Sequence, residues 1–145
     1  MSQPISQPMT YRDLVPTFPD PTTWTLDQVL RHHARVRPDA LALECPEESV
    51  TLTYAAGLAD AERLASGMLA AGARPGDRVV IMAANSSRFV RSWWATAVSS
   101  LVEVPVNTNY EGEFLRHQVT VVQPRFAVID DTYAERFVAI KEQVR

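Results

Sequence analysis

The chain has 145 residues, of which 46% are hydrophobic and 21% are charged, and its formal net charge at pH 7 is −3. This length and composition are typical of one globular domain and exclude a disordered chain. The acidic balance gives no electrostatic reason to expect nucleic acid as a partner, and no apolar run approaches the roughly 20 residues of a membrane span.

The first 22 residues carry five of the ten prolines and show no apolar periodicity. This pattern predicts an extended N-terminal arm over residues 1–22, with the folded part at 23–145. The arm also lacks the basic and then apolar layout of a signal peptide, so we expect a cytoplasmic protein. Cys45 is the single cysteine, which excludes an internal disulfide and a cysteine-based metal cluster.

The folded part is expected to begin with a helix that ends near Arg37. Thr25 and Gln28 have the spacing of a capping box at its start. Pro38 disfavours a helical conformation of the residue before it, which sets the end.

Two short segments, 40–44 and 50–53, are expected to pair as a β-hairpin. Thr53 is then placed to cap the next helix, in which apolar residues recur at helical spacing. Gly72 follows that helix, where a left-handed C-terminal cap is wanted.

The stretch "RPGDRVVIMAANSS", residues 74–87, contains a turn, an apolar run and a second, polar turn. Pro75 and Gly76 suit the central positions of the first turn. Residues 78–84 show no polar alternation, which predicts a strand covered on both faces, as in a parallel sheet. Asn85 is expected to cap the helix that follows.

That next helix carries two adjacent apolar rows, a broader apolar face than a surface helix has. Trp93 and Trp94 lie in these rows, so both are expected to fill the core rather than to stack on a ring-shaped ligand. A strand is expected to follow at 102–106.

The residues after 106 continue the alternation of expected helices and strands. Asn109 is expected to begin a helix at 110–122, and a strand is expected at 125–129. Thr132 and Glu135 have the spacing of a second capping box before a final helix. The alternation of helix and strand predicts an α/β fold: a parallel sheet with crossover helices, plus a short N-terminal hairpin.

The sequence contains no complete phosphate-binding or catalytic motif. A phosphate cradle usually needs several glycines within a few residues, and no G-x-G-x-x-G or G-K-[ST] occurs. The five glycines are scattered, at Gly57, Gly67, Gly72, Gly76 and Gly112. A plain helix cap is therefore favoured over a nucleotide site at Asn85.

Metal and acid–base sites are not favoured either. His32 and His33 are consecutive and point about 100° apart on a helix, and His117 has no partner at ligand spacing. Asp130 and Asp131 follow a strand, where a catalytic acid can lie, but helix capping is the favoured interpretation. We therefore expect no metal ligand and no catalytic residue.

One long stretch resembles a known family. "LTYAAGLADAERLASGMLAAGARPGDRVVIMAANSSRFVRSWWATAVSSLVEVPVN" is similar to the beginning of an AMP-forming acyl-CoA synthetase of the adenylate-forming superfamily. The matching parts are L-T-Y opening a helix, G-x-x-P-G-D-R-V before a strand, the Asn after that strand, and V-P-V-N. "NTNYEGEFLRHQ", 107–118, is most similar to the branch with carnitine/crotonobetaine-CoA ligases and aryl- or medium-chain acyl-CoA ligases. The resemblance covers residues 24–145.

The resemblance implies a ligase of fatty acid metabolism that uses ATP and Mg²⁺ to join a carboxylic acid to AMP. The acyl group then passes to the thiol of CoA. In such enzymes the residues that handle ATP lie downstream of the region seen here. We therefore expect part of a larger adenylate-forming N-terminal domain, inactive alone, whose partner is the remainder of the synthetase; a homo-oligomer stays open.

Two positions depart from the family's pattern. Ser100 stands where the family usually has glycine, a substitution that fits if its φ is negative. Asn109 stands two places after the Asn of V-P-V-N, where some relatives have a basic residue that approaches the CoA nucleotide. The resemblance thus implies Asn109 as the cofactor-binding candidate, with a weaker contact because its side chain is uncharged.

Two other functions stay open. The chain could be a free-standing binding or scaffold module from a split or degraded synthetase. It could also be a small nucleotide-binding α/β domain, which the missing glycine-rich loop opposes. The sequence does not identify the acyl substrate.

Overall fold

The computed structural model describes residues 20–144. The arm predicted over 1–22 lies outside them except for its last three residues, and Pro21–Thr23 form one turn of 3₁₀ helix, η2. Within the described range, no helix combines the length and the apolar character needed to cross a membrane.

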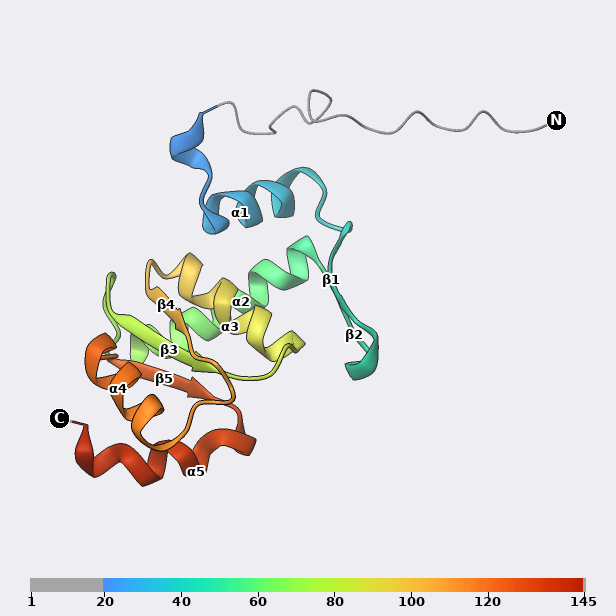
Figure 1. Cartoon of the computed structure of the whole chain (residues 1–145). Helices are drawn as coiled ribbons and strands as arrows, with labels where there is room; N and C mark the ends of the chain where they lie inside the picture. The colour runs from blue at the N-terminus through green and yellow to red at the C-terminus, as the bar shows by residue number, and fades with distance from the viewer. Residues whose placement is uncertain (1–19, 145) are drawn as a thin grey trace.

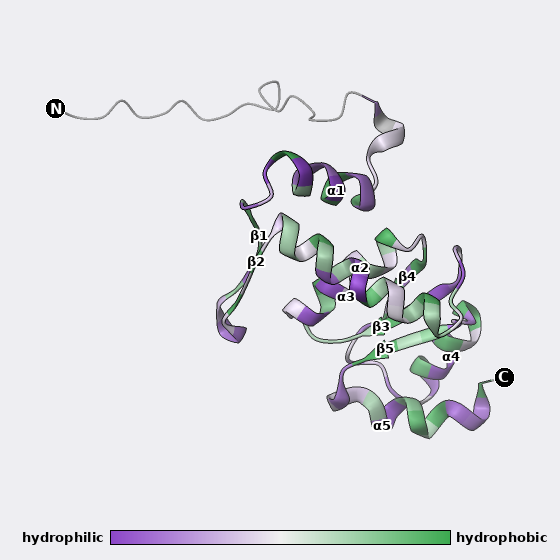
Figure 2. Ribbon diagram, turned by 180° about the vertical axis from the view of Figure 1, so that it is seen from behind, coloured by the Kyte–Doolittle hydropathy of each residue, from purple (hydrophilic) through white to green (hydrophobic). Residues whose placement is uncertain are grey.

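The centre of the fold is a parallel sheet of three strands in the order β4–β3–β5 (Figure 1). β3 (Arg78–Met82) lies between β4 (Val102–Pro105) and β5 (Phe126–Ile129) and pairs with both. Residues 79–82 are fully buried, because helices cover both faces of the sheet. Figure 2 shows hydrophobic residues along β5 as well. The predicted α/β fold with parallel strands is confirmed.

Two pairs of helices form the outer layers. α2 (Tyr54–Ala70) and α3 (Ser87–Val98) cover one face of the sheet, and α4 (Gly112–Val122) and α5 (Asp131–Ile140) cover the other.

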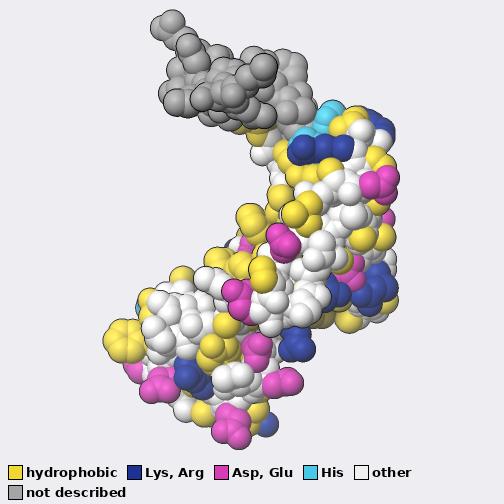
Figure 3. Space-filling view, turned by 90° about the vertical axis from the view of Figure 1, so that its right-hand side faces the viewer, with side chains coloured by type: hydrophobic (Ala, Val, Ile, Leu, Met, Phe, Trp, Pro, Cys, Tyr) yellow, Lys and Arg dark blue, Asp and Glu magenta, His cyan; other side chains and the backbone are white. Residues whose placement is uncertain are grey.

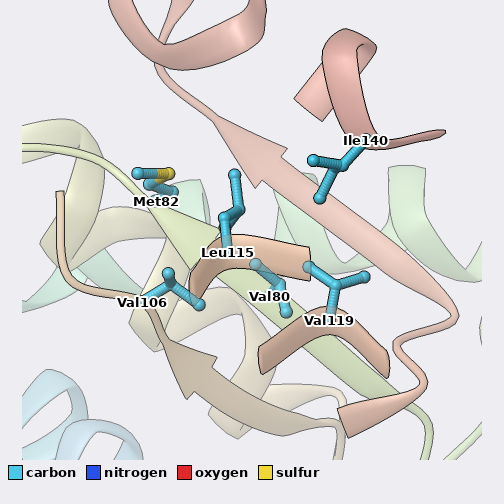
Figure 4. Close-up of a cluster of buried hydrophobic side chains, with 6 residues drawn as sticks. All are labelled: Val80, Met82, Val106, Leu115, Val119 and Ile140. Atoms are coloured by element: carbon cyan, nitrogen blue, oxygen red, sulfur yellow. The ribbon is translucent and has the colours of Figure 1, made fainter. Parts of the chain in front are cut away.

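Alternate residues of β3 point into the two layers, as the pleat of a strand requires. Val79 and Ile81 belong to the cluster on the α2–α3 side. Val80 packs on the other side with side chains from β3, the β4 end, α4 and α5 (Figure 4). The buried members of that second cluster are Val80, Met82, Val106, Leu115, Val119 and Ile140.

The N-terminal elements pack against the α2–α3 layer. α1 (Leu26–Val36) precedes the antiparallel hairpin of β1 (Leu41–Cys45) and β2 (Val50–Thr53), whose strands are joined by the 3₁₀ turn η3 (Pro46–Glu48). The hairpin was predicted correctly. The hydroxyls of the two expected N-cap residues, Thr25 and Thr53, accept hydrogen bonds from Gln28 N at 3.4 Å and Ala56 N at 3.3 Å. These elements share a third hydrophobic cluster with α2 and α3.

Three predicted N-cap residues are wrong by one or two positions. Ser86, not Asn85, caps α3: its hydroxyl accepts a hydrogen bond from Phe89 N at 3.2 Å. Asp130, not Thr132, caps α5 by accepting from Thr132 N at 3.1 Å, which confirms the capping role expected of this aspartate.

Asn109 does not begin α4. Residues 107–110 form a turn in which Tyr110 N donates to Asn107 O at 3.0 Å. The helix therefore starts only at Gly112, with Glu111 in the N-cap position and no side-chain cap. The wrong start has a physical reason: the Asn107 side chain already accepts from Asn109 N, at 2.9 Å, and closes the chain into the turn.

Trp93 is not in the core. It is 42% exposed, whereas Trp94 is 6% exposed and packs against α2. Consecutive helical residues point about 100° apart, so only one of the two can face the neighbouring helix. A Cβ added at Gly57 of α2 would lie 2.6 Å from Cζ3 of Trp94, so glycine makes the close approach possible. Figure 3 shows further hydrophobic side chains on the concave side of the molecule.

The condition under which serine would fit at position 100, a negative φ, is not met, because the φ of Ser100 is +56°. Ser100 N donates to Ala97 O at 3.2 Å and Leu101 N to Thr96 O at 2.9 Å, which is the hydrogen-bond pattern of a Schellman C-cap. The end of α2 has the same pattern with Gly72 at φ +96°, as predicted. Ser100 thus occupies a backbone conformation that favours glycine.

Candidate functional site

The carboxyl ends of the three parallel strands meet at one edge of the sheet. The chain leaves β3 for α3 on one face and leaves β4 for α4 on the other, so a crevice opens between these two strands. Open α/β sheets usually bind ligands in such a crevice. A cleft of about 420 Å³ lies there, lined by Ala83, Ala84, Asn85, Phe89, Pro105, Val106, Asn107 and Thr108. Its lining combines apolar surface with two side-chain amides.

A second, polar cleft of about 570 Å³ is lined by Glu48, Val50, Ser86, Ser87, Arg88, Arg91 and Asp130. Here the hairpin turn meets the start of α3. The Glu48 carboxylate accepts hydrogen bonds from Ser87 N at 2.9 Å and Ser87 Oγ at 2.6 Å. Both bonds lower the pKa of Glu48 below its ordinary value, and the bond from the Ser87 hydroxyl has the larger effect.

Glu48 therefore fills the place where an external anion would bind at this helix. The N-terminus of α3 carries partial positive charge and free backbone N–H groups, both of which attract anions. Because the protein's own carboxylate satisfies Ser87, the second cleft holds the hairpin onto α3 and offers no vacant phosphate cradle there. Neither Glu48 nor Ser87 was identified from the sequence, since 39 residues separate them and no motif links them.

Asp130 lines the second cleft but is committed to the end of α5. The hydrogen bond from the backbone N–H of Thr132 lowers the pKa of Asp130. A carboxyl held in its charged form is suited to capping and poorly suited to donating a proton. The structure thus supports the favoured interpretation of this residue.

Asn109, the predicted cofactor-binding residue, is exposed on the turn between β4 and α4. Its neighbour Thr108 lines the first cleft, so the turn forms one rim of that cleft. Arg136 of α5 binds this turn: its Nη1 donates to Thr108 O at 2.5 Å and to Tyr110 O at 3.4 Å.

Arg136 was not identified from the sequence, although a signal exists. Arg136 lies three residues after Tyr133 and four before Ile140, both of which pack in the α4–α5 cluster. An arginine on the packed face of a helix needs acceptors for its guanidinium group. The pattern therefore indicates a paired arginine, but it does not identify the carbonyls that pair with it.

The histidines do not come together as a metal site. His33 Nδ1 accepts from Arg37 Nε at 3.1 Å, and the His33 ring lies 4.9 Å from that of Tyr54. Burial is the main cause that lowers the pKa of His33, and the nearby Arg37 cation lowers it further. Among residues 20–144, no group of three or more His, Cys, Asp and Glu side chains is arranged to hold a metal ion.

The edge of the sheet offers binding surfaces, while the groups needed for a reaction are not brought together there. Glu48 and Asp130 are hydrogen-bonded to the backbone, and Arg91 pairs with Asp60. The one lysine, Lys141, lies after α5 and pairs with its neighbour Glu142 at 3.9 Å. The described part of the chain can therefore position a ligand but contains no evident acid, base or nucleophile poised for one.

Comparison with known proteins places this architecture in context. Residues 30–145 match the protein family described as AMP-binding enzyme. The chain is 31% identical over 99 residues to the mitochondrial medium-chain acyl-CoA ligase ACSF2 of Danio rerio, covering 68% of this chain and 16% of that protein. It is 38% identical over 80 residues to the long-chain-fatty-acid–CoA ligase FadD13 of Mycobacterium tuberculosis, covering 55% of this chain and 16% of that protein.

Solved structures show the same arrangement of elements. The N-terminal domain of FACL13 from Mycobacterium tuberculosis superposes with a TM-score of 0.77 at 28% sequence identity, covering 83% of this chain and 30% of that one. The chain thus spans less than a third of these proteins, and the matched solved structure is itself an N-terminal domain.

Proposed function

We propose a function for this chain from its family: it belongs to the AMP-binding enzyme family. The proposal is that the chain is the N-terminal part of an ATP-dependent, AMP-forming acyl-CoA ligase. The match over residues 30–145, together with relatives that are acyl-CoA ligases, carries the proposal. Such a ligase converts a carboxylate and ATP into acyl-AMP and pyrophosphate. The CoA thiol then displaces AMP, which leaves the thioester.

The segment's role in this reaction is to form part of the scaffold and one rim of a binding cleft. ATP and Mg²⁺ bring the electrophilic α-phosphate to the carboxylate, and the groups that hold them would lie outside residues 1–145. The charged groups of the second cleft support this division, because Glu48 and Asp130 accept hydrogen bonds from the backbone and Arg91 pairs with Asp60. We therefore propose that the segment has no ligase activity by itself.

Asn109 is the residue of this segment that we propose to face the CoA nucleotide. It is exposed, and it lies on a turn whose neighbouring residues line the cleft between β3 and β4. An uncharged amide can donate to and accept from a nucleotide without the charge attraction that a basic residue supplies. The contact would therefore contribute to CoA binding less than an arginine at this place.

The acyl substrate is proposed only as a class. The similarity of residues 107–118 to the branch with carnitine/crotonobetaine-CoA ligases and aryl- or medium-chain acyl-CoA ligases favours a short, medium-chain or aromatic acid. We propose the cytoplasm as the place of the reaction. Thioester formation should be measured for the protein encoded by the reading frame continued beyond Arg145, with medium-chain, long-chain, aromatic and crotonobetaine acids. We expect acyl-CoA and AMP in equal amounts. ADP as the product, or no thioester with any acid, would contradict the proposal.

A free-standing binding module is the second candidate, and the exposure of Trp93 is the observation that favours it. A tryptophan that is 42% exposed on a helix is an anchor that protein partners often use. The same thioester assay separates the two candidates, because a reading frame that ends at Arg145 cannot encode a ligase of the relatives' length.

A further inference from the structure

One arginine ties the turn between β4 and α4 to the rest of the molecule. Arg136 Nη1 donates to Thr108 O at 2.5 Å and to Tyr110 O at 3.4 Å, and its Nε lies 3.9 Å from Glu111 Oε2. These three contacts reach from α5 to the turn across 25 to 28 positions of the sequence. The two carbonyls flank Asn109 on either side along the chain.

The turn's own hydrogen bonds are internal. Asn109 N donates to the Asn107 side chain, and Tyr110 N donates to Asn107 O. Both bonds fix the shape of the turn, but neither holds it against α5. Arg136 supplies the hydrogen bonds that hold the backbone of the turn to α5, beside the packing of the Tyr110 side chain on the α4–α5 cluster, so the turn opens more readily without Arg136.

The guanidinium group is itself held in place. Its central carbon lies 5.2 Å from the centre of the Tyr133 ring, one helical turn earlier on α5. A planar guanidinium with five fixed donors orders the groups that it binds more sharply than a flexible ammonium does. Arg136 therefore has the anchor, the geometry and the partners to fix where the turn lies.

We propose that Arg136 is a positioning residue for the thiol-transfer step, since it fixes the turn that presents Asn109 to CoA. The role in thiol transfer rests on the proposed function, whereas the role of Arg136 in fixing the turn does not. In the structure Arg136 contacts the turn, Glu111 and the Tyr133 ring, and it lines neither cleft. Its loss should weaken CoA binding and leave the formation of acyl-AMP unchanged.

The structural part is tested by hydrogen exchange on the protein itself. Arg136→Met keeps the side-chain stem over Tyr133 and removes the donors. We expect the amides of Asn109 and Tyr110 to exchange about tenfold faster, because each charge-assisted bond that is lost lowers the cost of opening the turn. The buried amides of β3 should not change. If the amides of Asn109 and Tyr110 exchange at the wild-type rate in Arg136→Met, the proposal is overturned.

Arg116→Met is the matched control. Arg116 has the same 31% side-chain exposure as Arg136, but it pairs with Glu113 on its own helix. This variant should leave the turn amides at the wild-type rate. Faster exchange of Asn109 and Tyr110 in both variants would show a general loosening of the layer and would overturn a specific role for Arg136.

The functional part is tested in the ligase that carries this segment. Arg136→Met should raise the KM for CoA about fivefold or more, with ATP–pyrophosphate exchange at the wild-type rate, and Arg136→Lys should restore part of the loss. Equal losses in both half-reactions would overturn the role in thiol transfer. If the wild-type protein shows no exchange at all, the proposed function fails, while the hydrogen-exchange result still decides whether Arg136 positions the turn.

Discussion

The two helix layers on either side of the sheet are built differently. In the α2–α3 layer a tryptophan packs against a glycine, and ion pairs join one element to another, as Arg91 joins α3 to Asp60 of α2. In the α4–α5 layer the outer faces keep large apolar side chains exposed, and Phe114 is 75% exposed. The pair of Arg116 with Glu113 stays within α4, and the pair that joins the two helices, Arg136 with the N-cap residue Glu111, is longer, at 3.9 Å.

This difference suggests that the two layers have different roles: the α2–α3 layer stabilises the fold, and the α4–α5 layer holds the turn proposed to bind CoA. The α2–α3 layer is also covered by α1 and the hairpin, so the apolar contacts between its helices are buried. The α4–α5 layer carries the arginine that holds the Asn109 turn, and its outer surface is free of cover from the described residues. Substitutions at the contacts between α2 and α3 should therefore cost stability, whereas substitutions on the exposed outer face of α4 should cost little.

The largest difference in stability between variants of the two layers is expected for the aromatic residues. Trp94→Ala should lower the free energy of unfolding by about 3–5 kcal/mol, because it removes a buried ring and leaves a cavity. Phe114→Ala should change it by about 0.5 kcal/mol or less. Urea unfolding measures both. Trp93→Ala is a third variant, expected to behave like Phe114→Ala, and a loss as large as that of Trp94→Ala would show that the assignment of the two tryptophans is wrong.

Gly57→Ala tests the packing of Trp94 from the other side. The added methyl group would meet the ring at 2.6 Å, so the helices must move apart, at a cost of about 1–3 kcal/mol. Gly67 lies on the same helix with open space around its Cα. Gly67→Ala should stabilise the protein by about 0.5–1 kcal/mol, because alanine is the better helix former. Equal effects of the two variants on thermal unfolding would refute the close contact.

Asp60→Asn tests the ion pair between α2 and α3. The hydrogen bond from Arg91, followed by that from Arg63, lowers the pKa of Asp60. We expect a loss of about 1–2 kcal/mol at pH 7, since a charged hydrogen bond between helices is removed. A carboxyl whose pKa is lowered by folding stabilises above its unfolded pKa, near 3.9, so the difference from wild type should shrink as the pH falls below about 4.

Glu113→Gln is the counterpart of Asp60→Asn in the second layer. Glu113 is largely exposed, and its pair with Arg116 is screened by solvent, so little change in the unfolding midpoint is expected at any pH. A pH-independent loss for Asp60→Asn, or an equal loss for Glu113→Gln, would contradict the difference between the layers.

The last pair of variants concerns a feature that the layers share. Ser100 after α3 and Gln123 after α4 both have positive φ, +56° and +49°. Replacing either by glycine should stabilise the protein by roughly 0.5–1 kcal/mol, the relief of left-handed strain less the entropy that glycine adds to the unfolded chain. Calorimetry of the two variants should give similar gains. A loss at Ser100 would show that its side chain makes a contact worth more than the strain.

The sequence predicted the strands well because their signal is local. β3 is an uninterrupted apolar run after a Pro-Gly turn, and the helices between the strands have clear periodicity. Three adjacent polar residues, 85–87, can each cap a helix. The choice among them depends on Glu48, which binds Ser87 from a hairpin 39 residues earlier, so local pattern could not make it.

The tryptophans and the site residues show the same limit. Two adjacent apolar rows on α3 cannot both face α2, and Gly57 on the opposite helix decides which one does. Arg136 reaches the turn from 28 residues away, a pairing that no sequence spacing encodes. The family resemblance supplied Asn109 as a candidate, but only the structure showed that the turn carrying it is tied down.

The most direct test of the central claim is ATP–pyrophosphate exchange without CoA. It should be run with a panel of carboxylic acids, on the 145-residue chain and on the protein encoded by the reading frame continued beyond Arg145. Exchange needs groups that hold the α-phosphate in line with the carboxylate, and the described residues do not assemble them. We predict acid-dependent exchange by the longer protein and none by the 145-residue chain. Exchange by the 145-residue chain alone, or its absence from the longer protein with every acid, would contradict the account.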